Sequence, residues 1–374
     1  MRILQLIYES LHCPFGFGGA GVRAYEIYRR LRPNHDVTLL CMKYPGARDG
    51  ESEGLRHVFV GTESLSLPKS VIAYTFTAAR YVKQHAGEYD IIVENFLPST
   101  PFFSQLLSRT PVVLQVQGIL ESHALRKFRL FYGAPMFLVE HFYPRLYDRF
   151  IFVSPVTERK VMGRIGTAGR TSQVIPNGVG DDLFAAEKRE LDYILFFSRL
   201  DIYTKGLDIL ARAFGTVART HPGVRLVIAG YQFDPFEKVR MLCPPDVRDR
   251  VEYAGFLTGQ EKLDLLSGAS VAVLPSRHES SPVSILEAAA CGKPVLVSDI
   301  PELTFVRDQG FGVCFESGSA ESLAAALAGM LDDHSLRNRL GEAGRAFARE
   351  FTWDAIAARY EEALLRFASS PLHR

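Results

Sequence analysis

The stretch VAVLPSRHESSPVSILEAAACGKPVLVS, residues 271–298, decides the fold class. It opens with an apolar run at residues 271–275 and closes with another at residues 294–298, and both have the length of buried strands. Residues 282–291 between them have the composition and length of a helix. Two apolar strands joined by a helix indicate parallel strands of a sheet that helices cover on both faces.

The same alternation extends in both directions along the chain. Apolar strands are predicted at residues 3–8, 37–42, 58–60, 90–94, 112–116, 151–153, 193–197 and 224–229. Helices are predicted at residues 22–31, 71–84, 101–108, 206–220, 260–267 and, with a break near 351–353, 321–367. The sequence therefore predicts an α/β protein in which two halves repeat one doubly wound, Rossmann-like architecture.

The alternation lapses between residues 174 and 191, where turn chemistry at residues 176–178 precedes a charged stretch. We place a linker at residues 176–191, a first domain at residues 1–175 and a second at residues 192–350. Two facing Rossmann-like domains would form an interdomain cleft along the carboxyl ends of their strands.

Composition excludes several classes of protein. The 374 residues include 43 bases and 42 acids, a balance that argues against a nucleic-acid binder. The five cysteines form no Cys-x-x-Cys pair and indicate reduced thiols without a metal. The first apolar run is too short for a signal peptide, and no segment approaches the roughly 20 apolar residues of a membrane span. We expect a cytoplasmic protein, with peripheral contact at the inner face of the membrane left open.

A glycine-rich turn containing Gly18, Gly19 and Gly21 lies between the first strand and the first helix. Glycines allow close approach of the backbone to a ligand, and a helix N-terminus favours a phosphate. The spacing differs from Gly-x-Gly-x-x-Gly, which disfavours NAD. A tight turn without a ligand is the alternative.

Two bases follow the first strand of the second half. Arg199 leaves the carboxyl end of that strand, and Lys205 directly precedes the next helix. An Arg and a Lys at such a junction suit a diphosphate, because one binds in a bidentate manner and the other as a compact charge. An exposed loop with two solvated bases remains the alternative.

Two acids flank the helix start in the opening stretch. Ser281 is suited to cap that helix and Pro282 to occupy its first turn. Glu279 then lies over the carboxyl end of the strand, and Glu287 lies beyond the first helical turn. These carboxylates could accept hydrogen bonds from sugar or ribose hydroxyls; a solvated Glu287 on an amphipathic helix is the alternative.

Together these residues resemble the family-four retaining glycosyltransferases. The resemblance is carried by Glu279 and Glu287 with seven residues between them, by the helix-then-strand segment 286–295, and by the junction 175–179. The two bases, the glycine turn and residues 351–353 fit the same family, so that the resemblance runs from about residue 1 to residue 367.

The resemblance implies the GT-B fold, with residues 351–374 as a helix that returns to the first domain. It implies that Arg199, Lys205 and Glu279 are catalytic, the bases neutralising the donor diphosphate and Glu279 contacting the donor sugar. Glu287 would hold the ribose. The remaining residues implied for donor binding are Ser281, Pro282, Val283, Gly18, Gly19 and Gly21. No metal or cofactor is expected, because the substrate is a UDP- or GDP-type sugar.

One position departs from the family. After the strand at residues 112–116, where the family often has a histidine pair, the chain reads Gln117-Gly118. Gln117 can hydrogen-bond a sugar hydroxyl but cannot act as a base. We place Gln117, Gly118, His123 and Asn177 on the acceptor side. The resemblance implies front-face displacement, in which a leaving phosphate oxygen takes the acceptor proton.

The expected partners are a nucleotide-sugar donor and a sugar, lipid-linked or small-molecule acceptor. Residues 126–143 mix bases with large apolar side chains, a mixture that suits anionic lipid, the alternative being a helix with buried aromatics. Three other functions stay open: a nucleotide-sugar epimerase, a phosphorylase and an inactive nucleotide-sugar-binding module. The intact set of two bases and two acids favours the transferase.

Overall fold

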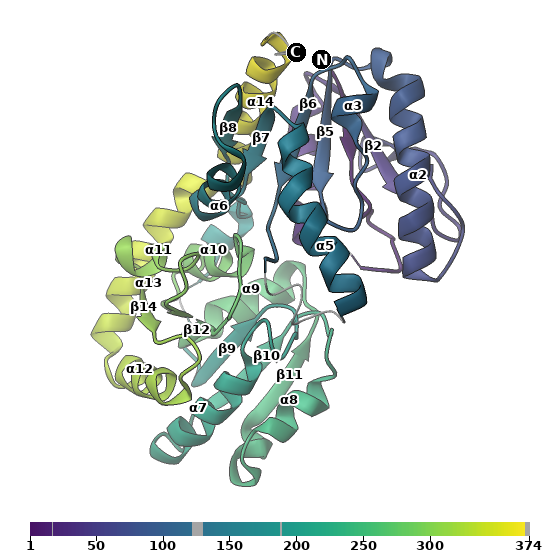
Figure 1. The fold of residues 1–374 in the computed structure, drawn as a ribbon. Coiled ribbons are helices and arrows are strands. Elements are labelled where there is room, and N and C mark those ends of the chain that lie inside the picture. Colours follow the sequence, from purple (N-terminus) through teal and green to yellow (C-terminus); the bar gives the residue numbers. More distant parts are fainter. Residues whose placement is uncertain (17, 122–129, 188, 371–374) are drawn as a thin grey trace. The chain divides into compact units, whose positions relative to one another are not determined.

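The computed structural model describes residues 1–16, 18–121, 130–187 and 189–370. The chain divides into two compact units (Figure 1). Unit 1 combines Met1–Asn177 with Trp353–Arg374, and unit 2 is Gly178–Thr352. The last helix of the chain therefore belongs to the first unit, and the residues predicted as a linker are shared between both.

Unit 1 is built on an eight-stranded sheet with the order β3-β4-β2-β1-β5-β6-β7-β8. All neighbours are parallel except β3 and β4. The strands are β1 Arg2–Leu6, β2 Asp36–Met42, β3 Gly50–Ser52, β4 Leu55–Val60, β5 Ile91–Phe96, β6 Val112–Val116, β7 Arg149–Phe152 and β8 Thr171–Val174. Strands β1, β5 and β6 are almost completely buried, and apolar residues make up most of each strand, as central parallel strands require.

The helices of unit 1 are α1 Gly19–Leu31, α2 Leu67–His85, α3 Ser104–Leu107, α5 Leu130–Phe142, α6 Pro155–Ile165 and α14 Trp353–Ser369. Two short 3-10 helices, η1 Ala86–Glu88 and η2 Tyr143–Leu146, follow α2 and α5. Helix α14 packs against α1. The Tyr360 hydroxyl of α14 also donates a hydrogen bond to Gln115 in β6 at 2.7 Å. This buried contact attaches the end of the chain to the sheet of unit 1.

Unit 2 is built on a fully parallel six-stranded sheet with the order β11-β10-β9-β12-β13-β14. The strands are β9 Tyr193–Phe197, β10 Arg225–Ala229, β11 Val251–Gly255, β12 Val271–Leu274, β13 Val295–Ser298 and β14 Gly312–Phe315. The α-helices are α7 Leu207–Thr220, α8 Phe236–Leu242, α9 Gly259–Gly268, α10 Val283–Ala290, α11 Phe305–Asp308, α12 Ala320–Asp332 and α13 His334–Ala348. Short 3-10 helices are η3 Asp181–Ala185, η4 Pro245–Arg250 and η5 Arg349–Phe351.

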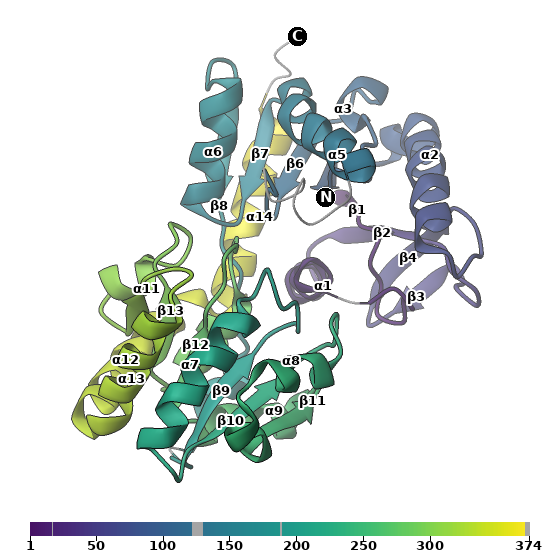
Figure 2. The ribbon, with the colours of Figure 1, turned by 60° about the horizontal axis from the view of Figure 1, so that its bottom comes forward.

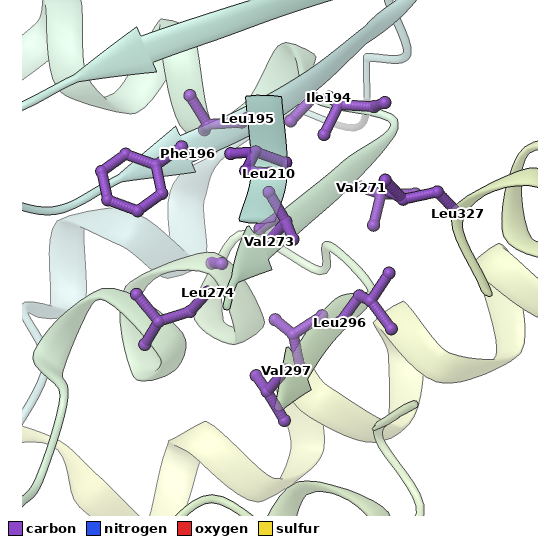
Figure 3. Packing of buried hydrophobic residues seen from close by; sticks show 14 of the residues in the cluster. Ile194, Leu195, Phe196, Leu210, Val271, Val273, Leu274, Leu296, Val297 and Leu327 are labelled. Carbon is purple, nitrogen blue, oxygen red and sulfur yellow. The ribbon is translucent and has the colours of Figure 1, made fainter. Parts of the chain in front are cut away.

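Figure 3 shows the core of unit 2. Leu210 of α7 and Leu327 of α12 lie among strand residues such as Ile194, Val271 and Leu296, and all five are completely buried. Burial of this kind stabilises the fold by about 1.5–3 kcal/mol for each large aliphatic side chain. The core thus fixes the strand ends from which the candidate site residues project.

The two parallel sheets covered by helices confirm the predicted α/β fold class, while several boundaries differ from prediction. Helix α10 begins at Val283 instead of residue 282, because Pro282 keeps an extended ψ of 113°. The helix predicted at residues 101–108 is only the short α3. Strands β8, β11 and β14 were not predicted, since each is short and includes polar residues or glycine. None of the described helices has both the length and the apolar character that crossing a membrane requires.

Each sheet has one point at which the strand order reverses. In unit 1 the chain leaves β1 toward β2 and returns to β5 on the other side; in unit 2 it leaves β9 toward β10 and returns to β12. Ligands of doubly wound folds bind at the carboxyl ends of the strands that flank such a reversal. Figure 2 shows the strands of both units from a second side.

Candidate active site

The strand reversal in unit 2 places Lys205 beside Glu279. The Lys205 Nζ atom lies 2.6 Å from Glu279 Oε1, and both side chains are mostly buried. The Ser276 hydroxyl donates to the same carboxylate oxygen at 2.6 Å. Residues that are 74 apart in the sequence therefore form one polar cluster where β9 and β12 end.

Backbone contacts hold the two loops of this cluster together. The Arg277 amide donates to the Thr204 carbonyl at 2.9 Å. Gly206 has a φ of +68°, and a Cβ atom there would lie 1.9 Å from the Pro275 carbonyl oxygen. Only glycine fits this approach, because a side chain would be strained by the positive φ and would collide with backbone. The close approach at Gly206 fixes the position of the adjacent Lys205.

Arg199 lies two residues after β9 and is 47% exposed. Its Nη2 atom is 3.3 Å from Asp201 Oδ2, and its guanidinium lies over the Phe233 ring, 5.6 Å from the centroid. The buried Asp201 carboxylate also accepts the Thr204 amide at 3.0 Å, which orders the loop that leads to Lys205. The arrangement leaves an exposed guanidinium face at the same strand end.

Glu287 forms a second, separate ion pair. It lies in α10, and its Oε1 atom is 2.9 Å from Nζ of Lys262 in α9. Burial would lower the pKa of Lys262, but the charge and hydrogen bond of Glu287 more than offset this, so that the pKa lies above its ordinary value. Glu279 and Glu287 are thus each paired with a different lysine.

The residues between the two glutamates form the start of α10. Ser281 and Pro282 precede the helix, Pro282 stands at the N-cap position, and Val283 is the first helical residue. All three are partly exposed. The N-terminus of α10 is therefore partly exposed and lies within a few residues of Glu279 in the sequence.

In unit 1 the glycine-rich turn at residues 18–21 is hydrogen-bonded to the Glu9 carboxylate. The buried Glu9 side chain accepts hydrogen bonds from the Gly18 amide at 2.9 Å and the Gly21 amide at 2.7 Å. Burial raises the pKa of Glu9, partly offset by these bonds. Gly19 is the first residue of α1. Two of the amides that were predicted to face a donor phosphate thus already have an acceptor.

The predicted acceptor-side residues lie in different surroundings. Gln117 and Gly118 directly follow β6, and Gln117 Nε2 donates to Asn95 Oδ1 at 2.9 Å. Asn177 is buried and accepts a hydrogen bond from Arg23, whose guanidinium also donates to the Ile175 and Pro176 carbonyls. His123 lies outside the described residues.

Arg23 holds the end of unit 1's first chain segment. Its side chain is fully buried, and burial lowers its pKa to about 10. The bonds to three consecutive residues explain the fixed path of the chain as it leaves unit 1. The asparagine at position 177 therefore has a structural partner in addition to its predicted role.

Several of these residues carried no recognisable signal in the sequence. Glu9 lies nine residues before Gly18, and Lys262 lies 25 before Glu287, so that neither belongs to a local motif. Asp201 is different, because an acid two residues after Arg199 is visible in the sequence. Within the described residues, no group of three or more His, Cys, Asp or Glu could hold a metal ion.

The segment predicted to suit lipid is only partly described. Arg126 to Arg129 lie outside the described residues. Tyr143 is buried and donates to the Glu94 carboxylate at 2.5 Å, whereas Leu138 and Phe142 are exposed. Tyr143 thus belongs to the interior of unit 1, whereas Leu138 and Phe142 lie at its surface.

Comparison with known proteins identifies the family. The description "Glycosyltransferase Family 4" matches residues 17–183, and "Glycosyl transferases group 1" matches residues 182–347. A glycogen synthase of Mycobacterium tuberculosis is 31% identical over 96% of this chain and 92% of its own. The MMP alpha-(1->4)-mannosyltransferase of Mycolicibacterium hassiacum is 26% identical, covering 99% of this chain and its whole length.

The fold of this chain agrees with that of a solved structure. HepE of Anabaena, in complex with UDP and glucose, superposes with a TM-score of 0.77 at 19% identity, covering 98% of this chain and all of its own. The chain belongs to the family-four glycosyltransferases with the GT-B fold, and it is a glycosyltransferase.

Proposed function

We propose that unit 2 seats a nucleotide diphosphate sugar at the ends of β9 and β12, and that the enzyme transfers the sugar to an acceptor hydroxyl with retention of configuration. The observation that carries this proposal is the Lys205–Glu279 pair at the strand reversal, with the exposed Arg199 at the end of the same strand. A base, an acid and a second base at one strand end match the diphosphate and hydroxyl groups of such a donor.

The roles follow from the chemistry of each group. Lys205 has three donors, and one contact with Glu279 leaves others to meet a phosphate oxygen. Arg199 supplies the larger exposed guanidinium. Glu279 accepts hydrogen bonds only, and thus suits the hydroxyls of the donor sugar. Ser276 and Lys205 hold its carboxylate in place before the donor arrives.

The chemical step makes a new bond from the acceptor oxygen to the anomeric carbon and breaks the bond to the diphosphate. The diphosphate leaves with the electron pair, and one of its oxygens takes the acceptor proton. Fixed cations stabilise this developing negative charge, which is the largest contribution that such a site offers. The proposal needs no metal, because Arg199 and Lys205 supply the positive charge.

Relatives support a choice of donor and product class. The similar proteins named above include a glycogen synthase, a mannosyltransferase and a protein bound to UDP and glucose. We propose a glucosyl or mannosyl donor of UDP or GDP type, used in polysaccharide or glycolipid synthesis. Gln117 and Gly118 with the neighbouring Asn95 remain the candidates for acceptor contacts, together with His123 and Asn177.

A thermal-shift screen with UDP, GDP, ADP and their glucose and mannose derivatives tests the proposal. A ligand that binds the folded state raises the melting temperature with increasing concentration. We expect the nucleotides of one nucleobase to raise the melting temperature of the parent protein. The variant Lys205→Ala should lose this rise in melting temperature. Lys238→Ala, an exposed lysine on α8, is the matched control and should retain it.

Product analysis separates the alternatives. Incubation with the stabilising donor should slowly release free sugar, and with an acceptor it should give a product with the anomeric configuration of the donor. Conversion of the donor to its epimer would indicate an epimerase. Stabilisation without any turnover would indicate an inactive binding module, and no stabilisation by any diphosphate would contradict the donor site itself.

A further inference from the structure

Helix α2 carries one exposed stripe that the donor site does not use. Lys69, Ile72, Phe76, Arg80 and Lys83 are all exposed and follow one another at helical spacing. At about 100° per residue they fall within roughly 80° of the helix circumference. Ile72 is 59% exposed and Phe76 is 74% exposed.

The opposite face of α2 explains why the stripe cannot turn inward. Ser70, Tyr74, Ala78 and Val82 are completely buried, and α2 packs along β2 and β4 (Figures 1 and 2). Tyr74 also donates a hydrogen bond to the Leu40 carbonyl at 2.7 Å. The helix is therefore fixed on the sheet, and its apolar stripe stays at the surface.

The charged residues within the stripe all have one sign. Residues 67–85 contain no Asp or Glu. Of the acids that flank the helix, Glu63 is paired with Lys43 at 3.0 Å, and Glu88 lies 2.8 Å from His85, which is charged only when it is protonated. In the described part of the chain, no carboxylate lies within ion-pair distance of Lys69, Arg80 or Lys83. Leu65, 74% exposed just before the helix, extends the apolar surface.

We propose that this stripe, Leu65 with Lys69, Ile72, Phe76, Arg80 and Lys83, docks unit 1 on an anionic lipid surface. Large apolar side chains lined by bases bind where acyl chains meet anionic headgroups. Each base near such a surface contributes about 1 kcal/mol, and the apolar side chains add the free energy of their burial. A second copy of the chain fits less well, because stripe against stripe would oppose like charges.

Flotation with lipid vesicles tests the docking surface. The full-length protein is mixed with vesicles of phosphatidylcholine alone, or of equal amounts of phosphatidylcholine and phosphatidylglycerol. We expect flotation with the anionic vesicles only, and its loss at high salt because surface charges are then screened. Equal binding to both vesicles, or no binding to either, would overturn the proposal.

One triple variant and one double variant separate the contribution of charge to vesicle binding from that of apolar contact. Lys69→Gln with Arg80→Gln and Lys83→Gln should weaken binding about 100-fold, since about 3 kcal/mol is lost. Ile72→Ser with Phe76→Ser should also remove flotation. Leu365→Ser on α14, a comparably exposed leucine of the same unit, is the control and should leave binding unchanged.

Folding and self-association are measured on the same samples. All variants should keep the circular dichroism spectrum and the melting temperature of the parent protein, because the replaced side chains face solvent. Vesicle binding that survives in both variants would overturn the proposal. A concentration-dependent dimer that Ile72→Ser with Phe76→Ser dissociates would also overturn it, and would assign the stripe to a second copy.

Discussion

The two units share one strand-and-helix pattern but treat the start of their first helix in opposite ways. In unit 1 the chain's own Glu9 carboxylate accepts the Gly18 and Gly21 amides at the N-terminus of α1. In unit 2 the corresponding helix α7 is preceded by Lys205 and Gly206, and Glu279 approaches from the loop after the neighbouring strand β12. Topology thus gives both units the same kind of strand-end position, whereas the charges beside it differ. This difference in charge is the reason why we propose unit 2 as the site of the anionic donor.

The largest effect is expected at the tightest contact in this comparison. In Gly206→Ala, the alanine would have to adopt a positive φ, and its Cβ atom would lie 1.9 Å from the Pro275 carbonyl oxygen. This substitution should therefore destabilise unit 2 by about 3 kcal/mol or more. Gly19→Ala in unit 1 has open space around the new atom and is expected to change stability by less than about 1 kcal/mol. Urea denaturation followed by circular dichroism measures both. Equal tolerance of the two alanines would contradict the described loop contact.

The next effect concerns turnover. Arg199→Ala and Lys205→Ala should each lower transfer by about 10²-fold or more, as does removal of one charge-stabilising donor in other enzymes. Arg199 is exposed, so Arg199→Ala should keep a melting temperature close to that of the parent protein. Lys205→Ala should lower it, because the mostly buried Glu279 carboxylate then loses its cationic partner. Steady-state assays with the donor found in the thermal-shift screen provide the measurement, with Lys238→Ala as control. Near-normal turnover in both variants would refute the catalytic role of these bases.

A smaller effect is predicted for Glu9 in unit 1. Glu9→Ala leaves two amides without their acceptor and should cost about 1–3 kcal/mol of stability. Glu9→Gln keeps an acceptor without a charge. Because burial raises the pKa of Glu9 in the folded protein, protonated Glu9 favours folding at low pH, and this advantage is lost as the pH rises through the raised pKa.

Melting temperatures measured between pH 4 and 8 test the sign of this effect. The stability of Glu9→Gln relative to the parent protein should increase as the pH rises above the ordinary carboxyl pKa of 4.5. A relative stability that falls with rising pH would show that the Glu9 pKa is lowered instead.

The smallest effect is expected for Glu287. Glu287→Gln removes one charge from the pair with Lys262 and weakens the proposed contact with the ribose. Donor binding should weaken by about 1 kcal/mol, which raises the KM for the donor roughly fivefold. The turnover number should change little. A large loss of kcat with an unchanged KM would show that Glu287 acts on the transition state and not on the ribose.

Much of the architecture could be predicted from the sequence, because long apolar strands and amphipathic helices carry periodic patterns. The run at residues 112–116 is a buried strand as predicted, and the run predicted at residues 271–275 is a buried strand over residues 271–274. Strand β14, of sequence GVCF, was not predicted because four residues with a glycine lack any period. The short α3 shows a similar limit, since the backbone becomes extended at Ser108 and the helix ends after four residues.

The candidate site was predictable where residues follow strand ends, as Arg199, Lys205 and Glu279 do. Their contacts were not, because pairing depends on which strands are neighbours. The adjacency of β9 and β12 brings Lys205 to Glu279, whereas Glu287 faces Lys262 across two helices. The Glu9 contact with the glycine turn depends on a loop conformation that the sequence pattern does not encode.

A crystal structure of the protein with its nucleoside diphosphate tests the central claim most directly. The account predicts a phosphate oxygen within hydrogen-bond distance of Lys205 Nζ and of the Arg199 guanidinium, while the Gly18 and Gly21 amides keep their bonds to Glu9. A diphosphate bound at the Gly18 and Gly21 amides, with Glu9 displaced and Lys205 contacting only Glu279, would contradict it.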